Sequence, residues 1–222
     1  MTTAPANTAS FDTMRHAMVV SQLRTSAVDD ARVVEAMAAV PREAFVPESV
    51  RHIAYIDRQL PVGGGRFVNT PLATGRLITA VDLSANDNVL IVGAGAGYAA
   101  AVVARIARRV TAVEQDADLA AAARAALAGI ANVTLVEGPL ADGASADAPY
   151  DVVIIDGAVV SVPDAIVAQL RVDGRIATGL VDRGVTRLAS GRRTEGGFGL
   201  ADFADLDCAI LPGFSKPTKF RF

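Results

Sequence analysis

The sequence has little of several residue types on which whole classes of protein depend. Its 222 residues include one cysteine, two histidines and no tryptophan. A single cysteine, Cys208, excludes an internal disulfide and is typical of a reducing compartment. Neither His16 nor His52 has a neighbour at the spacing of metal ligands, so no metal site is expected. Cys208 lies in an apolar stretch that predicts a C-terminal strand, so we expect a buried and unreactive thiol.

The sequence also lacks the segments that membrane and nucleic-acid-binding proteins need. It has no uninterrupted apolar run of about 18 residues. Its basic residues are scattered, and the formal net charge is −3, so a broad basic face for nucleic acid is not expected. Residues 1–10 are small and polar, without the basic start and apolar block of a secretory signal, and predict a disordered tail. We therefore expect a cytoplasmic protein, a monomer or weak homo-oligomer, that binds neither membrane nor nucleic acid.

The most informative stretch runs from residue 89 to Glu114. Residues 89–92 are all apolar, which is typical of a strand buried on both faces of a parallel sheet. A glycine-rich turn and a predicted helix over residues 99–108 follow, and a second predicted strand, residues 109–113, ends at Glu114. Glycines let a ligand approach the backbone, and a carboxylate at this strand end can accept hydrogen bonds from both ribose hydroxyls. The three glycines stand at alternate positions: Gly93, Gly95 and Gly97.

The spacing of these glycines indicates which nucleoside is bound. A dinucleotide site has the pattern Gly-x-Gly-x-x-Gly, whereas the third glycine here comes one position early and Tyr98 stands in its place. The pattern with Glu114 therefore favours S-adenosylmethionine over NAD. Two alternatives stay open at this point: a nicotinamide oxidoreductase, and a plain strand-to-helix turn that binds no ligand.

Strands and helices alternate between residues 89 and 180. This alternation predicts an α/β fold, Rossmann-like and doubly wound, whose mostly parallel sheet has helices on both faces. Ligands of such sheets bind at the carboxyl ends of the strands. Gly93, Glu114, Gly138 and Asp156 are all expected at such ends.

We expect a single domain over residues 11–222. Residues 11–81 form an N-terminal helical extension with an active-site loop, and residues 82–222 form the cofactor-binding core. Alternating apolar residues at 185–189 and 203–211 predict an antiparallel strand pair at the C-terminal end.

The loop-like segment is residues 59–71, which contains three consecutive glycines. Such a run indicates either a backbone that bends sharply against a ligand or a flexible surface loop. A helix over residues 72–81 is predicted after it. Near the N-terminus, Asp29 or Asp30 is expected to cap a helix over residues 31–39.

Short sequence motifs across most of the chain indicate one family. They are residues 14–19, 30–37, 40–47, 54–63, 89–98, 148–151, 169–170 and 174–175. In these motifs the chain resembles the protein-L-isoaspartate O-methyltransferase family, and the similarity is weak after Val181. The resemblance implies S-adenosylmethionine as cofactor and isoaspartyl-containing peptides or damaged proteins as substrates. Such enzymes methylate the free carboxylate of the isoaspartyl residue, and the ester then closes to a succinimide, which begins repair.

The resemblance also implies the residues of the site. Asn69 stands where the family has its active-site serine and is the expected catalytic residue. The expected cofactor-binding residues come from the loop, the glycine-rich turn and the ends of the following strands. They are Arg66, Phe67, Val68, Gly93, Ala94, Gly95, Ala96, Gly97, Glu114, Gln115, Pro139, Leu140 and Asp156.

Four positions depart from the family's pattern. Asn69 replaces the serine, Phe67 a threonine, Ile91 an acid that holds the cofactor's amino end, and Pro139 an aspartate near the adenine. Three lost polar contacts at about 1 kcal/mol each amount to roughly a hundredfold in cofactor affinity. Two alternatives follow: a degenerate member that binds a partner without catalysis, and a methyltransferase with a changed acceptor. In the second, Arg66 either pairs with the acceptor carboxylate or is a solvated surface arginine.

Overall fold

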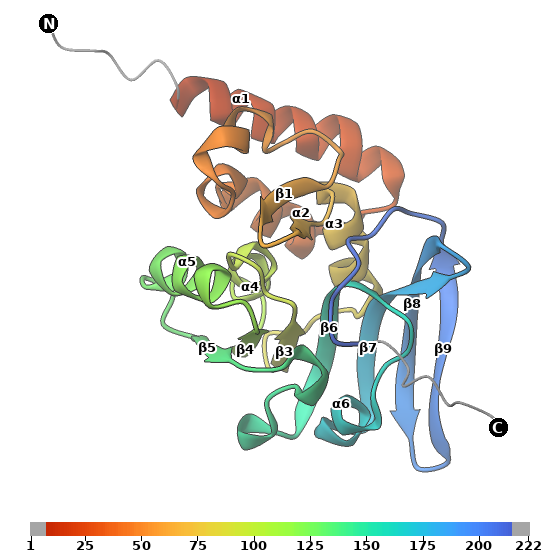
Figure 1. Ribbon diagram of the computed structural model, residues 1–222. Coiled ribbons are helices and arrows are strands. Elements are labelled where there is room, and N and C mark those ends of the chain that lie inside the picture. Colours follow the sequence, from red (N-terminus) through yellow and green to blue (C-terminus); the bar gives the residue numbers. More distant parts are fainter. Residues whose placement is uncertain (1–7, 215–222) are drawn as a thin grey trace, which may run out of the picture.

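A seven-stranded sheet forms the centre of the protein in the computed structural model, which describes residues 8–214 (Figure 1). The strand order is β5-β4-β3-β6-β7-β8-β9. The first five strands run parallel, and β8 and β9 are each antiparallel to the strand before them. The strands are β3 (Asn88–Val92), β4 (Arg109–Glu114), β5 (Val133–Glu137), β6 (Tyr150–Val159), β7 (Leu170–Asp182), β8 (Val185–Thr194) and β9 (Gly197–Ala204). The expected α/β sheet is confirmed.

Six α-helices surround this sheet within residues 8–214. They are α1 (Thr8–Met18), α2 (Ala31–Ala39), α3 (Pro71–Ala80), α4 (Tyr98–Val103), α5 (Ala117–Leu127) and α6 (Asp164–Gln169). Shorter helical turns follow α1 at Val19–Leu23 and Arg24–Ser26 and occur at Arg42–Phe45, Glu48–Ile53, Leu140–Asp142 and Ser145–Asp147. The N-terminal helices α1, α2 and α3 lie together at the top of the view in Figure 1, as the expected helical extension.

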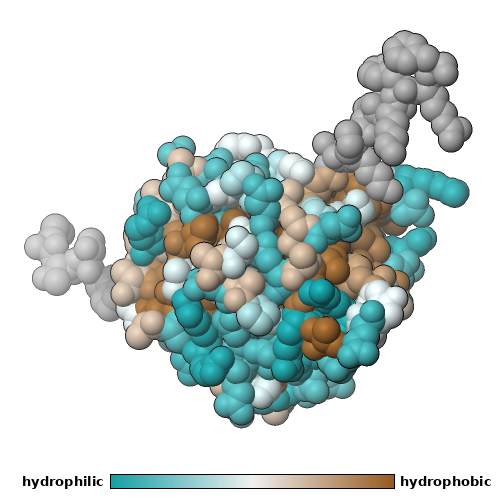
Figure 2. Space-filling model, turned by 90° about the horizontal axis from the view of Figure 1, so that it is seen from below, coloured by the Kyte–Doolittle hydropathy of each residue, from teal (hydrophilic) through white to brown (hydrophobic). Residues whose placement is uncertain are grey.

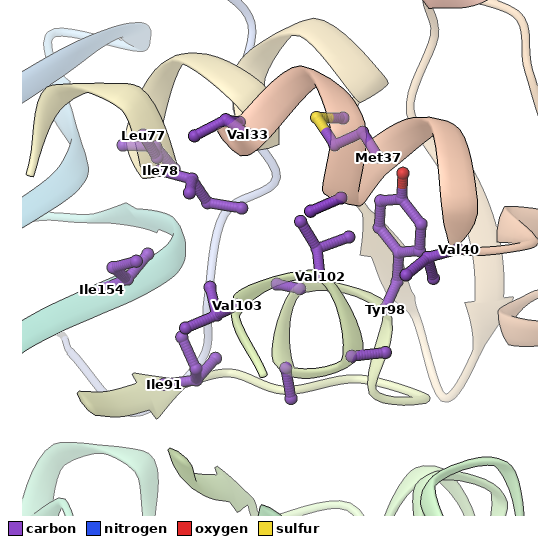
Figure 3. Close-up of a cluster of buried hydrophobic side chains, with 14 of the residues drawn as sticks. Val33, Met37, Val40, Leu77, Ile78, Ile91, Tyr98, Val102, Val103 and Ile154 are labelled. Carbon is purple, nitrogen blue, oxygen red and sulfur yellow. The ribbon is translucent and has the colours of Figure 1, made fainter. Parts of the chain in front are cut away.

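Each face of the sheet carries its own hydrophobic core. Alternate residues of β3 point to opposite faces, so Val89 and Ile91 belong to one buried cluster and Leu90 and Val92 to the other. In the first cluster, side chains of α2, α3 and α4 pack together above Ile91 (Figure 3). Because every residue of β3 is buried, the strand presents only its carboxyl end to a ligand.

Polar side chains cap three of the helices, and the first of them is one of the two expected caps. Asp30 accepts a hydrogen bond from the Arg32 amide at the start of α2, and Thr70 accepts one from the Ala73 amide at the start of α3. Asp116 does the same for α5. These contacts use backbone N–H groups that have no partner within a helix.

Several expected boundaries were wrong. The loop-like segment contains a two-stranded hairpin, β1 (Leu60–Gly63) and β2 (Arg66–Val68). The helix after the glycine-rich turn ends at Val103, and α1 begins at Thr8 inside the expected tail, whose first seven residues lie outside the described range. The last strand, β9, ends at Ala204, so Cys208 lies in an irregular segment instead of a strand.

Apolar residues on the face in Figure 2 form separate patches between hydrophilic side chains. Over residues 8–214, no helix combines the length and apolar character needed to cross a membrane.

Candidate functional site

The carboxyl ends of β3, β4 and β6 meet at one edge of the sheet, and the glycine-rich turn lies there. Gly93, Gly95 and Gly97 have φ angles of 81°, 55° and 101°, which lie in the left-handed region that glycine adopts at little cost. The amides of Gly93 and Ala94 donate to the Val113 carbonyl and hold the turn against β4. The expected tight turn is therefore present.

Glu114 is completely buried at the end of β4, and both of its carboxylate oxygens are hydrogen-bonded. Oε1 accepts from the amides of Gln115 and Asp116, at 2.9 and 3.0 Å, and Oε2 accepts from the Gly95 amide at 2.7 Å. Arg66 adds a two-pronged ion pair, with Nη1 2.8 Å from Oε1 and Nη2 3.3 Å from Oε2. In this conformation five N–H groups donate hydrogen bonds to the Glu114 carboxylate, which was expected to accept hydrogen bonds from the ribose hydroxyls.

Arg66 comes from the β1–β2 hairpin, which folds over the end of β4. Its turn contains Gly63, Gly64 and Gly65, all with left-handed φ angles. A Cβ at Gly64 would lie 2.7 Å from an Asp116 carboxylate oxygen, so the close approach of the hairpin needs glycine there.

The side chain of Arg66 is only 8% exposed, which corrects the alternative of a solvated surface arginine. The next residue, Phe67, is 46% exposed. Its ring therefore does not share the enclosed environment of Arg66.

Asn69 is buried and uses both ends of its side-chain amide. Nδ2 donates to Asp156 Oδ1 at 2.8 Å, while Oδ1 accepts from the Ala209 amide at 2.7 Å and from the Cys208 thiol at 3.2 Å. Burial raises the pKa of that thiol, in agreement with the expected unreactive cysteine. Asn69 thus links the loop between β2 and α3 to β6 and to the segment after β9.

Asp156 lies within β6 and faces this network. Its Oδ1 also accepts from the Thr74 hydroxyl at 3.1 Å. Burial raises the pKa of Asp156, and the hydrogen bonds from Asn69 and Thr74 and the charges of Arg42 and Arg66 oppose that rise. The carboxylate is therefore held by donors but poorly hydrated.

Arg42, which the sequence did not single out, and Tyr98 extend the network. Arg42 is fully buried, donates to the carbonyls of Ala54 and Asn69, and places its guanidinium 4.7 Å from the centre of the Tyr98 ring. Burial lowers the pKa of Arg42, and burial raises the pKa of Tyr98 to about 12. Arg42 lies in residues 40–47, one of the motifs that carry the family resemblance, but the sequence does not show that its charge is buried in the core.

The remaining expected cofactor residues flank the same edge of the sheet. Ala94 is buried and Ala96 half-buried in the glycine-rich turn, and Val68 is half-buried at the end of β2. Gln115 is exposed beyond Glu114. Pro139 precedes the turn that begins at the buried Leu140, next to the end of β5.

An open cavity of about 730 Å³ adjoins the loop between β2 and α3 at Thr70. Its other walls come from the segment before β1, from the start of β8 and from the segment after β9. Three carboxylates and one arginine line it: Asp57, Asp205, Asp207 and Arg58. The charged side chains that line the cavity are thus mainly acidic.

Comparison with known proteins gives a consistent result. Residues 14–196 match the family model described as protein-L-isoaspartate(D-aspartate) O-methyltransferase. A protein-L-isoaspartate O-methyltransferase 1 of Rhodopseudomonas palustris strain HaA2 is 41% identical over 83% of this chain and 77% of its own length. One from Methylorubrum extorquens strain PA1 is 44% identical over 73% of this chain and 72% of its own. None of these matches supports a degenerate member.

Solved structures show the same fold. A protein-L-isoaspartate O-methyltransferase aligns with 90% of this chain and 66% of its own at a TM-score of 0.78 and 24% identity. A Plasmodium falciparum protein, described as a putative member in complex with S-adenosyl-L-homocysteine, aligns with 90% of this chain and 97% of its own at a TM-score of 0.72 and 17% identity. By the extent of the family match and by its identity to the curated relatives, this chain belongs to the protein-L-isoaspartate(D-aspartate) O-methyltransferase family.

Proposed function

We propose that this protein is an S-adenosylmethionine-dependent methyltransferase that esterifies the free carboxylate of isoaspartyl residues in damaged proteins or peptides. The observation that carries this proposal is the position of Glu114. A buried carboxylate ends β4 beside a left-handed glycine-rich turn, in a chain 41% identical to a curated enzyme of this activity. Such a carboxylate suits two ribose hydroxyls.

The residues at this edge fit the cofactor in kind. Glu114 supplies the ribose acceptor, and the cradle from Gly93 to Gly97 supplies close backbone approach for the methionine portion. Gln115, Pro139 and Leu140 flank the adenine side, while Arg66, Phe67 and Val68 cover the cleft from the hairpin. Ile91 is fully buried in the strand and offers no carboxylate for the amino end of the cofactor. We assign that role to the carboxylate of Asp156.

The chemistry asks little of the protein beyond positioning. The cofactor supplies a methyl group on a positive sulfonium, and the acceptor carboxylate is already ionised at neutral pH, so no general base is needed. We assign Asn69 the orientation of the acceptor carboxylate through its Nδ2–H donor. Asn69 must exchange Asp156 for the acceptor to do so, because Nδ2 donates to Asp156 here.

We place the acceptor peptide in the cavity lined by Thr70, the residue that follows Asn69 in the chain. Its three carboxylates favour isoaspartyl peptides with basic flanking residues over acidic ones. We further propose that the enzyme works in the cytoplasm as a monomer or a weak homo-oligomer. The single cysteine, buried and unpaired, supports a reducing compartment.

Methyl transfer to a defined peptide pair tests the function. The protein is incubated with methyl-labelled S-adenosylmethionine and either an isoaspartyl peptide or its aspartyl isomer of identical sequence. The proposal predicts a base-labile methyl ester on the isoaspartyl peptide alone. Label on both peptides equally, or on neither at saturating cofactor, would contradict it.

A further inference from the structure

Arg42 carries a positive charge in the protein interior. It begins the helical turn Arg42–Phe45 and is completely buried. Among residues 8–214, its guanidinium forms no ion pair with a carboxylate, and its Nη1 has no hydrogen-bond partner. Burying an unpaired charge is unfavourable, and an arginine does not relieve this by losing its proton. The charge is therefore expected to act on the groups around it.

The hydrogen bonds of Arg42 hold the loop that carries Asn69. Nε donates to the Ala54 carbonyl at 2.8 Å, and Nη2 donates to the Asn69 carbonyl at 2.5 Å. The guanidinium carbon also lies 4.7 Å from the centre of the Tyr98 ring. Ala54 comes before the β1–β2 hairpin and Asn69 directly follows it, so one guanidinium fixes the backbone on both sides of the hairpin.

The charge of Arg42 acts on Asp156, the buried carboxylate that accepts from Asn69. The other titratable groups that interact with Asp156 are Arg66 on β2, Tyr98 on α4 and Cys208 after β9. Burial raises the pKa values of Tyr98 and Cys208, so both are neutral near pH 7. Arg66 is paired with Glu114, which compensates its charge. Within the described part of the chain, Arg42 is therefore the uncompensated cation that acts on Asp156.

We propose that Arg42 is a positioning residue of the methyltransferase site. Its charge keeps the Asp156 carboxylate ionised to attract the amino group of the cofactor, and its N–H groups fix the backbone of Asn69. This proposal rests on the proposed function, which assigns those roles to Asp156 and Asn69. The Asn69 side chain can then exchange Asp156 for the acceptor carboxylate while the backbone of its loop stays in place.

The charge of Arg42 influences the pH range in which the cofactor binds. Burial raises the pKa of Asp156, and the charge of Arg42 is one of the interactions that oppose this rise. Removal of that charge therefore raises the pKa of Asp156 further. A protonated Asp156 does not attract an ammonium group, so a ligand that needs the carboxylate binds more weakly at low pH.

Isothermal titration across the acid and neutral pH range tests the charge. The ligands are S-adenosylhomocysteine and 5′-methylthioadenosine, which has the same nucleoside but no amino acid portion. The variants are Arg42→Met, which removes the charge, Arg42→Lys, which keeps it, and the control Arg175→Met. Arg175 is 15% exposed and its Nη2 lies 2.6 Å from Asp87 at the amino ends of the strands, so its loss measures the general effect of removing a largely buried arginine.

For Arg42→Met, we expect the pH midpoint of S-adenosylhomocysteine binding to lie above that of the wild type. Below both midpoints the affinity should be at least about tenfold lower. The affinity for 5′-methylthioadenosine should match that of the wild type, and Arg42→Lys and Arg175→Met should keep the wild-type midpoint. A wild-type midpoint in Arg42→Met, an equal upward move in Arg42→Lys, or no binding of S-adenosylhomocysteine by the wild type would overturn the proposal.

Methyl transfer by Arg42→Lys tests the hydrogen bonds separately from the charge. Lysine keeps the charge but lacks the planar fork that reaches both carbonyls. We expect kcat for an isoaspartyl peptide to fall at least about tenfold with an unchanged KM for S-adenosylmethionine, because Asn69 is no longer held in place. An unchanged kcat would overturn the proposal, and this result decides the matter even where Arg42→Met does not fold.

Failure of the proposed function gives a different pattern. In that case the wild type forms no ester on an isoaspartyl peptide, while Arg42→Met still moves the midpoint of S-adenosylhomocysteine binding to higher pH. Such a result contradicts the function and leaves the action of Arg42 on Asp156 in place.

Discussion

Replacement of Arg66 by alanine isolates the buried ion pair at the centre of the site. The side chains of Arg66 and Glu114 are 8% and 0% exposed, and two N–H groups of the guanidinium contact the carboxylate. Removing one partner of a buried pair leaves an uncompensated charge and destabilises by about 3–5 kcal/mol. Three backbone amides still bond to Glu114, so we expect the lower end of this range.

Urea denaturation and thermal unfolding measure this effect. A loss of about 3 kcal/mol lowers the melting temperature of a chain of this size by roughly 6–12 °C. Arg124→Ala is the matched control, because Arg124 is 61% exposed and its Nη2 lies 3.6 Å from Glu137. We expect a change of at most about 1 kcal/mol there. Equal losses for the two variants would refute the assignment of Arg66 and Glu114 as a buried, strongly coupled pair.

Three further substitutions test neighbouring contacts. Gly157→Ala is expected to destabilise by about 1–3 kcal/mol in urea, because its Cβ meets Leu211 and a backbone carbonyl, whereas Gly138→Ala meets nothing and should be nearly neutral; equal effects would contradict the packing. Asp156→Asn should gain stability over the wild type as pH rises above 3.8, measured by thermal unfolding at several pH values. The raised pKa means that the protonated carboxyl stabilises the fold at low pH and that this contribution is lost through the folded-state pKa, so a pH-independent difference would contradict burial as its cause. Asn69→Ser should lower stability by about 1–3 kcal/mol, because serine cannot bridge its two partners, yet raise methyl transfer to an isoaspartyl peptide; unchanged activity would contradict the role of residue 69.

The sequence predicted the parts of the site that depend on local pattern. A buried apolar run, alternate glycines and an acid at the end of the next strand require only short-range geometry, and the structure places Glu114 accordingly. The caps Asp30 and Asp116 were predictable for the same reason, since each acts on its own helix.

Contacts between distant segments were not predictable from pattern. Arg66 and Glu114 are 48 residues apart, and they meet because three left-handed glycines fold a hairpin over β4. Residues 203–211, which include Cys208, were expected to form a strand because their apolar residues alternate. Asp205 and Asp207 interrupt that stretch, and β9 ends before them. The apolar residues Leu211 and Phe214 beyond them are buried in the hydrophobic cluster that also contains Leu90 and Val92.

The most direct test of the account is the fate of an isoaspartyl peptide over many turnovers. The peptide is incubated with the enzyme and S-adenosylmethionine, and its isoaspartyl and aspartyl forms are separated by chromatography and counted over time. The account predicts that the aspartyl form accumulates only when both enzyme and cofactor are present, because each methyl ester closes to a succinimide that partly hydrolyses to aspartate. An isoaspartyl peptide that stays unchanged while the protein binds the cofactor would contradict it.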